Sequence, residues 1–121
     1  MSIRLKRAYG PPAKEDGARL LVERLWPRGL TKAKAAIDEW FKDVAPSPVL
    51  RKWFGHDPEK WEDFRRRYRD ELRGNAPEVE RLRARIKAAK GPVTFVFAAK
   101  DEEHNAALVL KDYLERASRK S

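Results

Sequence analysis

The feature that most constrains the fold is an almost wholly apolar run, VTFVFAA, at residues 93–99. Its valine, threonine and phenylalanine residues favour strands, and Gly91-Pro92 just before it ends any preceding helix. A second apolar run, LLV, occupies residues 20–22 within a predicted strand over residues 19–25. A strand without polar alternation is buried on both faces, which is typical of a parallel sheet. The two runs therefore predict neighbouring strands of a small parallel sheet.

A further strand is predicted at the N-terminus, where Ile3 and Leu5 alternate with Arg4 and Lys6. Helices are predicted elsewhere from apolar spacings of three and four and from capping residues. The first has Thr31 as its N-cap, with the apolar stripe Ile37, Trp40, Phe41 and Val44.

Four more helices are predicted after it. Ser47 caps a short helix through Phe54, Asp57 caps the next, and Asn75 with Glu78 resembles a capping box for the third. The last helix is predicted to start at Asp101. Strands separated by helices predict a single α/β domain over residues 1–121, with a mainly parallel sheet of about three strands and helices packed around it.

Composition limits the chemistry and the partners. The chain has no cysteine, which excludes disulfides, thiolate metal sites and thiol catalysis. Its net charge of +9 favours anionic partners, with the excess in residues 1–30 and 61–90. The sequence has no apolar stretch typical of a membrane span or a signal peptide, so we expect a cytoplasmic protein without a membrane partner. It indicates no oligomeric state.

The segment 24–34 is the first candidate for a ligand site. Arg24 ends a predicted strand, Arg28 lies in a loop, and Lys32 and Lys34 oppose the dipole of the predicted helix start. A bound anion would make those lysines favourable, and the two arginines would add bidentate contacts to a phosphate or carboxylate. The alternative is that the lysines are simply solvated. In open parallel sheets ligands bind beyond the carboxyl ends of the strands, where Trp26 would form a wall.

The segment 100–105 follows the other buried strand and is expected to face the first segment. Asp101, with the glutamates after it, suits a helix start on stability grounds alone. Lys100 and His104 are left unexplained, and His104 falls three residues after Asp101 on the same side of the helix start. A carboxylate beside an imidazole can form an acid–base pair, so Asp101, His104 and Lys100 are the candidate catalytic residues.

Two more side chains are assigned to the same pocket, Trp53 as a wall and His56 as a ligand-binding residue. Both have structural alternatives, since a joint between two helices is a common place for a structural histidine. The sequence predicts no metal site and identifies no cofactor, because the spacing of metal-binding motifs and a nucleotide-binding glycine-rich loop are both missing. Whether the protein is an enzyme is left open.

A different function is suggested by the arginine-rich predicted helix at residues 58–73. Arg65, Arg69 and Arg73 fall at spacings of four and would form an exposed row able to contact nucleic-acid phosphates or a partner protein. Arg66 and Arg67 can instead pair with acidic residues one turn earlier. No nucleic-acid-binding motif accompanies the row, so this function ranks below the anion pocket.

Three blocks of sequence, LVERLWPRGLTKAKA, WFGHDPEKWEDFRRRY and FAAKDEEHNAALVL, resemble the YeaO-like branch of the domain of unknown function 488 family. The resemblance covers nearly the whole chain and implies a small bacterial or archaeal α/β domain without an established activity. Another branch of that family carries cysteines around the end of its last strand, followed by a Cys-His-Arg. Residues 98–107 here contain neither cysteine nor that arginine, so a thiol-based role does not carry over.

Overall fold

Four parallel strands form one sheet in the computed structural model, which describes residues 3–120, with side chains described up to residue 116. The strands are β1 (Ile3–Arg7), β2 (Ala18–Leu21), β3 (Glu39–Trp40) and β4 (Val93–Phe97). Their order across the sheet is β1-β4-β2-β3, and every neighbouring pair is parallel. The predicted α/β class is confirmed, with one more strand than the three expected.

The extra strand, β3, replaces most of a predicted helix. Helix α1 (Lys32–Ala35) has Thr31 as its N-cap, as predicted, but it ends after four residues at Ala36, whose φ is 49°. The chain then pairs with β2 through Leu20↔Glu39 and Leu21↔Trp40. Trp40 and Phe41 pack against opposite faces of the sheet, which adjacent residues of one helix cannot do. The helical prediction was therefore wrong beyond Ala35.

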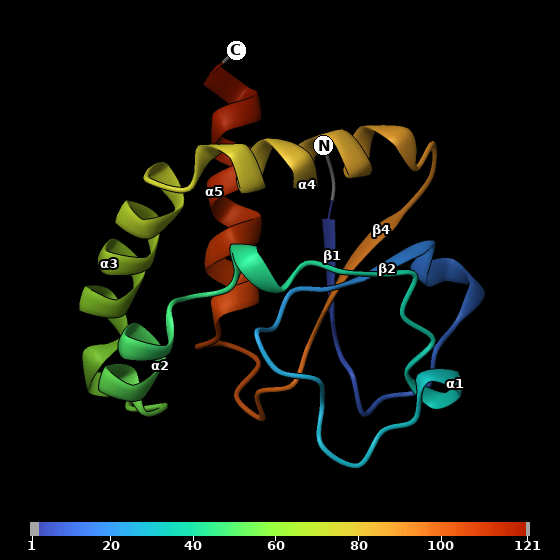
Figure 1. Cartoon of the computed structure of the whole chain (residues 1–121), viewed down its shortest axis with the longest axis horizontal. Helices are drawn as coiled ribbons and strands as arrows, with labels where there is room; N and C mark the ends of the chain where they lie inside the picture. Colours follow the sequence, from blue (N-terminus) through green and yellow to red (C-terminus); the bar gives the residue numbers. More distant parts are fainter. Residues whose placement is uncertain (1–2, 121) are drawn as a thin grey trace.

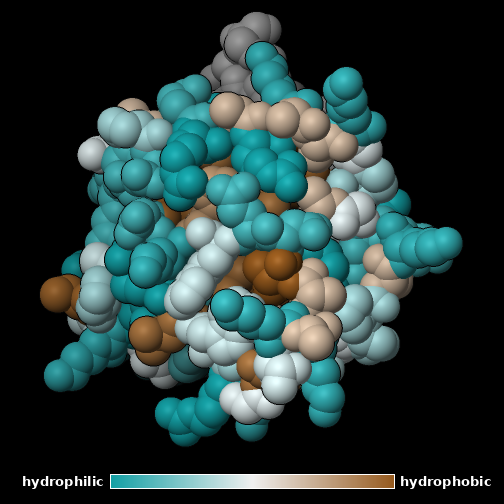
Figure 2. Space-filling view, turned by 45° about the vertical axis from the view of Figure 1, so that its right-hand side comes forward, coloured by the Kyte–Doolittle hydropathy of each residue, from teal (hydrophilic) through white to brown (hydrophobic). Residues whose placement is uncertain are grey.

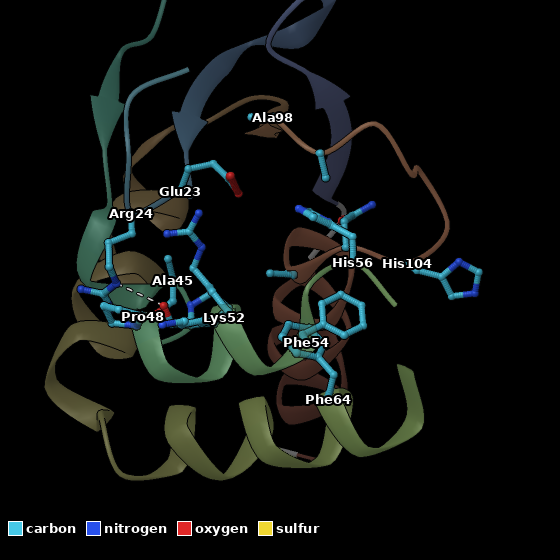
Figure 3. Close-up of a pocket in the computed structure, with 15 residues that line it drawn as sticks. Glu23, Arg24, Ala45, Pro48, Lys52, Phe54, His56, Phe64, Ala98 and His104 are labelled. Atoms are coloured by element: carbon cyan, nitrogen blue, oxygen red, sulfur yellow. Dashed lines mark hydrogen bonds between the residues drawn. The ribbon is translucent and has the colours of Figure 1, made fainter. Parts of the chain in front are cut away.

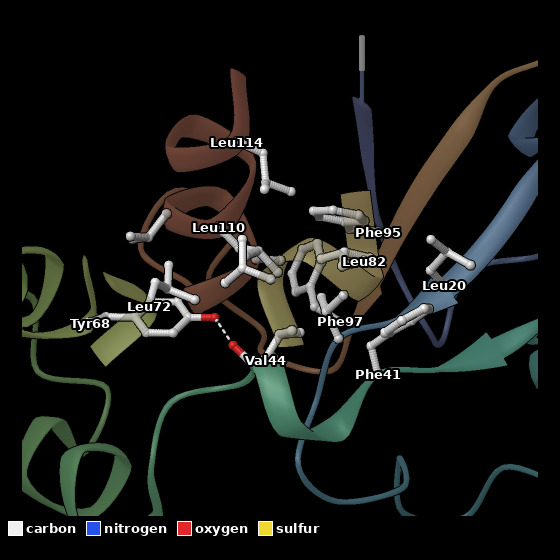
Figure 4. Packing of buried hydrophobic residues seen from close by; sticks show 14 of the residues in the cluster. Leu20, Phe41, Val44, Tyr68, Leu72, Leu82, Phe95, Phe97, Leu110 and Leu114 are labelled. Atoms are coloured by element: carbon white, nitrogen blue, oxygen red, sulfur yellow. Dashed lines mark hydrogen bonds between the residues drawn. The ribbon is translucent and has the colours of Figure 1, made fainter. Parts of the chain in front are cut away.

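The main core lies between one face of the sheet and four helices (Figure 1). These are α2 (Pro48–Phe54), α3 (Trp61–Arg73), α4 (Ala76–Ala88) and α5 (Ala106–Lys120). Figure 4 shows Phe95 of β4, Leu82 of α4 and Leu110 of α5 meeting in this core. Tyr68 of α3 is fully buried beside them and donates its hydroxyl hydrogen to the Val44 carbonyl oxygen at 2.5 Å.

One predicted helix start was wrong, and one predicted start was correct but lacks the predicted capping box. Helix α5 begins at Ala106, not at Asp101, and Asn105 caps it by accepting a hydrogen bond from the Leu108 N–H at 2.9 Å. Asp101 instead caps a separate turn, accepting from the Glu103 and His104 N–H groups. Asn75 does precede α4, but its side chain donates to the Asp43 carbonyl oxygen and does not cap the helix.

The opposite face of the sheet is covered by loops and by α1. Buried Ala8, Leu21 and Val96 form a small second cluster there. Four half-buried apolar side chains pack over it, Trp26, Leu30, Ile37 and Trp40. Figure 2, which brings the α1 side of the molecule forward, shows apolar side chains set among a mainly hydrophilic surface. This face is thus covered by single side chains and not by a layer of long helices.

The loop before β2 passes very close to the residue before β4. Gly17 has a φ of 64°, and a Cβ placed on it would lie 2.0 Å from the Pro92 carbonyl oxygen. The Ala18 N–H donates to that same oxygen at 3.0 Å, and the Thr94 hydroxyl donates to the Asp16 carbonyl oxygen at 2.8 Å. The close approach is therefore built into the pairing of β2 with β4.

We predict that Gly17→Ala lowers the free energy of unfolding by about 3 kcal/mol, because the methyl group requires a backbone shift and the left-handed φ disfavours alanine. Gly29→Ala is the matched control. Gly29 also has a positive φ, 81°, but a Cβ there would meet nothing within 4 Å, so only the conformational cost of about 1 kcal/mol is expected. Urea unfolding of both variants measures the difference, and equal losses would contradict the role given to the Pro92 contact.

Candidate functional site

A cavity of about 430 Å³ opens at the carboxyl ends of β2 and β4 (Figure 3). This is the place where open parallel sheets bind ligands, and the volume falls in the range of small-molecule sites. The lining comes from the ends of both strands, from α2 and the loop before it, and from the turn before α5. It comprises Glu23, Arg24, Ala45, Pro46, Pro48, Arg51, Lys52, Phe54, His56, Phe64, Ala98, Ala99, His104, Asn105 and Ala106.

Parallel pairing explains why two distant segments meet in this cavity. β2 and β4 run side by side in register, with Leu21 opposite Val96. The chains that leave the two strands therefore emerge together, which places Glu23 and Arg24 beside Ala98 and Ala99. The sequence predicted that residues 24–34 would meet residues 100–105. In the structure, Arg24 of the first segment lines the same cavity as His104 and Asn105 of the second.

Helix α2 forms the cationic wall and is held in place at its N-terminus. Ser47 accepts a hydrogen bond from the Leu50 N–H at 3.1 Å, as a helix N-cap does. Glu71 of α3 accepts from both the Ser47 N–H, at 2.9 Å, and the Ser47 hydroxyl, at 2.6 Å. One carboxylate thus fixes the cap that orients α2. The helix then presents Arg51 and Lys52 to the cavity.

Arg24 has a positioning contact as well as a place in the lining. Its Nε donates to the Pro46 carbonyl oxygen at 3.1 Å, and its Nη2 donates to the Ala45 carbonyl oxygen at 2.9 Å. Those two carbonyls belong to the segment that leads into α2. Part of the hydrogen-bonding capacity of Arg24 is therefore used to hold the cavity wall, which leaves Arg51 and Lys52 as the freer cations.

Glu23 was not predicted as a site residue, yet it is the one acidic side chain among the lining residues. Burial raises the pKa of its carboxyl, while the charge of Arg51 and the backbone N–H of Ala98 act in the opposite direction. Among the described residues Glu23 has no ion pair within 4.0 Å. Burial also raises the pKa of Tyr68, and the Glu23 charge adds to that rise. Glu23 is thus a desolvated carboxyl group in a mainly cationic cavity.

Asp101 and His104 are in direct contact, as their spacing suggested. The His104 Nδ1 lies 2.9 Å from the Asp101 Oδ2, and the edge-to-face contact with Trp61 places the two ring centroids 5.2 Å apart. Backbone N–H groups of Glu103 and His104, together with the His104 side chain, lower the pKa of Asp101. If Nδ1 carries the hydrogen, Nε2 is the nitrogen that can meet a ligand. Their catalytic role stays a prediction.

His56 lies at the rim, beyond the end of α2. Gly55 and His56 both have left-handed backbone conformations, with φ of 53° and 59°, and they turn the chain sharply out of the helix. A positive φ is uncommon for histidine, so the turn is held by its surroundings. The centroids of the His56 and Phe54 rings lie 6.2 Å apart, and both side chains line the cavity.

Several predicted site residues lie outside the cavity lining. Trp26 packs edge-on against Trp40, with ring centroids 5.6 Å apart, on the second face of the sheet. Arg67 and Lys60 lie over the ring of Trp53. The remaining four are exposed and do not line the cavity: Arg28, Lys32, Lys34 and Lys100. A four-residue helix also gives the lysines little dipole to oppose.

The arginine-rich helix α3 is largely neutralised by its own acidic residues. Arg65 pairs with Glu62 and Arg66 pairs with Asp63, at 3.2 Å and 3.0 Å. Arg73 pairs with Asp70.

Across residues 3–116, no group of three His, Asp or Glu side chains is arranged to hold a metal ion.

We predict that Glu23→Gln raises the free energy of unfolding at pH 8. The Glu23 carboxyl has a higher pKa in the folded than in the unfolded state, so the folded state binds more protons. The free energy of unfolding therefore falls as the pH rises above 4.5, the ordinary pKa of a glutamate side chain. Glutamine removes that loss and keeps an acceptor for the Ala98 N–H. The gain should shrink toward zero by about pH 3, where both states are protonated. Thermal unfolding from pH 3 to 8 measures it.

Glu102→Gln serves as the control, because Glu102 is exposed and lies outside the cavity lining. This variant should show no such pH-dependent gain. A Glu23→Gln protein less stable than its parent at pH 8 would contradict the desolvation of Glu23.

Comparisons with known proteins place the chain among relatives without a stated activity. A family model described as "Inactive DUF488-N3 subclade" matches residues 2–121. The "Uncharacterized protein YeaO" of Escherichia coli is 46% identical over 114 residues, which cover 94% of this chain and 97% of that protein. The "Uncharacterized protein Rv3073c" of Mycobacterium tuberculosis is 39% identical over 92 residues, 76% of this chain and 78% of that protein.

No solved structure matches the chain. Of the helices in the described part of the chain, none has the length and apolar character needed to cross a membrane.

Proposed function

Because the chain belongs to the inactive DUF488-N3 subclade, we propose that it acts as a binding protein whose cavity holds a small anionic ligand. The observation that carries the proposal is the charge of the cavity lining. Arg24, Arg51 and Lys52 face a single carboxyl, that of Glu23. His56 and His104 add hydrogen-bonding groups at the rim. A phosphate or carboxylate group is the chemistry that such a lining favours.

The arrangement of the cations supports binding through α2. Arg51 and Lys52 are consecutive on a helix whose cap is fixed by Glu71, so the backbone positions from which both side chains reach the cavity are fixed before a ligand arrives. Preorganised charges around a partly enclosed space interact more strongly with an anion than solvated surface charges do. Lys32 and Lys34 belong to a four-residue helix and do not line the cavity.

The Asp101–His104 contact supports a second role within the same cavity. With Nδ1 directed at Asp101, the imidazole ring is held in one orientation and His104 lines the space that a ligand would occupy. In a binding protein this pair would contribute a hydrogen bond to the ligand. In an enzyme it would transfer a proton, which is the catalytic role that the sequence analysis assigned to Asp101, His104 and Lys100. The subclade description favours the first of these roles.

The nucleic-acid alternative has weaker support. Three of the arginines on α3 are paired with acidic side chains one turn away, and Arg67 lies over Trp53. Phosphate contacts by this helix would have to compete with those pairs.

We predict that sulfate or phosphate raises the melting temperature of the parent at constant ionic strength and that Arg51→Ala removes most of this rise. Ligand-dependent stabilisation follows the occupancy of the folded state, so a tenfold loss of affinity lowers the effect by about 1.4 kcal/mol at saturating ligand. Lys52→Ala gives a second test if Arg51→Ala unfolds too readily. Differential scanning fluorimetry measures the shifts.

Arg28→Ala is the matched control, because it removes the same charge from an exposed loop outside the cavity lining. Its anion-induced shift should equal that of the parent. Equal shifts in Arg51→Ala, Lys52→Ala and the parent, or a loss confined to Arg28→Ala, would overturn the assignment of the anion to this cavity.

A further inference from the structure

Glu23 is the lining residue that simple anion binding does not explain. A carboxylate among cations weakens their attraction for an anionic ligand, and its burial is unfavourable for the charged form. The fold supplies the Ala98 backbone N–H as a partner for this carboxyl but no counter-charge, since no described cation lies within 4.0 Å of it. Figure 3 shows the carboxyl group of Glu23 directed into the cavity from the end of β2.

The Glu23 carboxyl has acceptor capacity to spare. An ionised carboxylate offers about four lone-pair positions. Among the described residues, the one hydrogen-bond donor that affects its pKa is the neighbouring backbone N–H of Ala98. The Glu23 side chain is half-buried and lines the cavity, so its remaining acceptor positions are open to a hydrogen-bond donor that enters the cavity.

The cations of α2 do not fill that role. Arg51 affects the Glu23 carboxyl by its charge, but no side-chain nitrogen of Arg51 lies within 4.0 Å of a Glu23 carboxyl oxygen. Arg24, the next residue along the chain, directs its Nε and Nη2 to the carbonyl oxygens of Pro46 and Ala45. The cavity lining therefore has the Glu23 carboxyl at the end of β2, which Figure 3 shows, and two cations contributed by α2, and the volume of about 430 Å³ leaves room for a small ligand.

We propose that the ligand is a small zwitterion, whose anionic group faces Arg51 and Lys52 and whose ammonium group donates hydrogen bonds to Glu23. This inference rests on the proposed function and specifies its ligand class. An ammonium group suits the site better than a hydroxyl group, because it supplies several N–H donors and also neutralises a desolvated charge. An ammonium at Glu23 and an anion at Arg51 would each meet the opposite charge at its own end of the cavity.

Two pairs of probes separate the ammonium contribution from the anionic one. Taurine and ethanesulfonate share a sulfonate and differ in the ammonium group, and β-alanine and propionate share a carboxylate and differ in the same way. Affinities are measured by NMR titration of the ¹⁵N-labelled protein, followed at the Ala98 amide beside Glu23. In the parent, the aminated member of at least one pair should bind about tenfold more tightly, the contribution expected of one charge-assisted hydrogen bond.

In Glu23→Gln the aminated and non-aminated members of each pair should bind with about equal affinity, because glutamine accepts hydrogen bonds without the charge that attracts ammonium. Glu102→Gln, which removes an exposed carboxylate outside the cavity lining, should keep the parental preference.

Equal affinities within both pairs for the parent would overturn the zwitterion inference and leave the anion site standing. A preference that survives in Glu23→Gln would overturn the assignment of the ammonium to Glu23. Failure of all four probes to bind a protein that sulfate stabilises through Arg51 would likewise overturn this inference alone. If neither sulfate nor any probe binds, the proposed function fails with it.

Discussion

The parallel pairing of β4 with β1 on one side and β2 on the other is the constraint on which the rest of the structure depends. Every residue of β4 is buried, so the strand must be covered on both faces. Parallel strands end at the same edge of the sheet, and this brings Glu23 beside Ala98 although 75 positions separate them in sequence. The cavity follows from that pairing, because the chain leaves both strands at one place and must turn away from it.

Hydrogen bonds to the segment before α2 fix the direction of this helix, which carries the cations Arg51 and Lys52 at the edge of the sheet where the cavity lies. Glu71 holds the Ser47 cap, and Arg24 holds the carbonyl oxygens of Ala45 and Pro46. Both contacts act on the same short segment, so the direction of α2 depends on an acidic residue of α3 and a basic residue after β2. Neither contact is itself a ligand contact. Their effect is to bring two cations into the same cavity as one half-buried carboxyl, and this is the arrangement from which both the anion site and the zwitterionic ligand are inferred.

Much of the fold could be predicted from the sequence because its evidence is local. The buried runs, the Ser47 cap and the glycine after α2 identify their elements without knowledge of the tertiary structure. β3 could not be identified in this way, since two residues form a strand only through pairing with β2. The family resemblance noted in the sequence was confirmed by the comparisons.

In the cavity, Arg24, His56 and His104 were predicted, whereas Glu23, Arg51 and Lys52 were missed. Charged residues on a helix or after a strand are usually solvated, and only the tertiary structure brings these three to one cavity. The available clue was the position of Glu23 directly after a buried run.

The most direct test is a crystal structure determined from crystals soaked in selenate. The anomalous signal of selenium locates the bound anion without ambiguity. Our account predicts a peak inside the cavity, within hydrogen-bonding distance of Arg51 or Lys52, and on the opposite side of the space from the Glu23 carboxyl. A peak beside Lys32 and Lys34 on α1 with an empty cavity would contradict it.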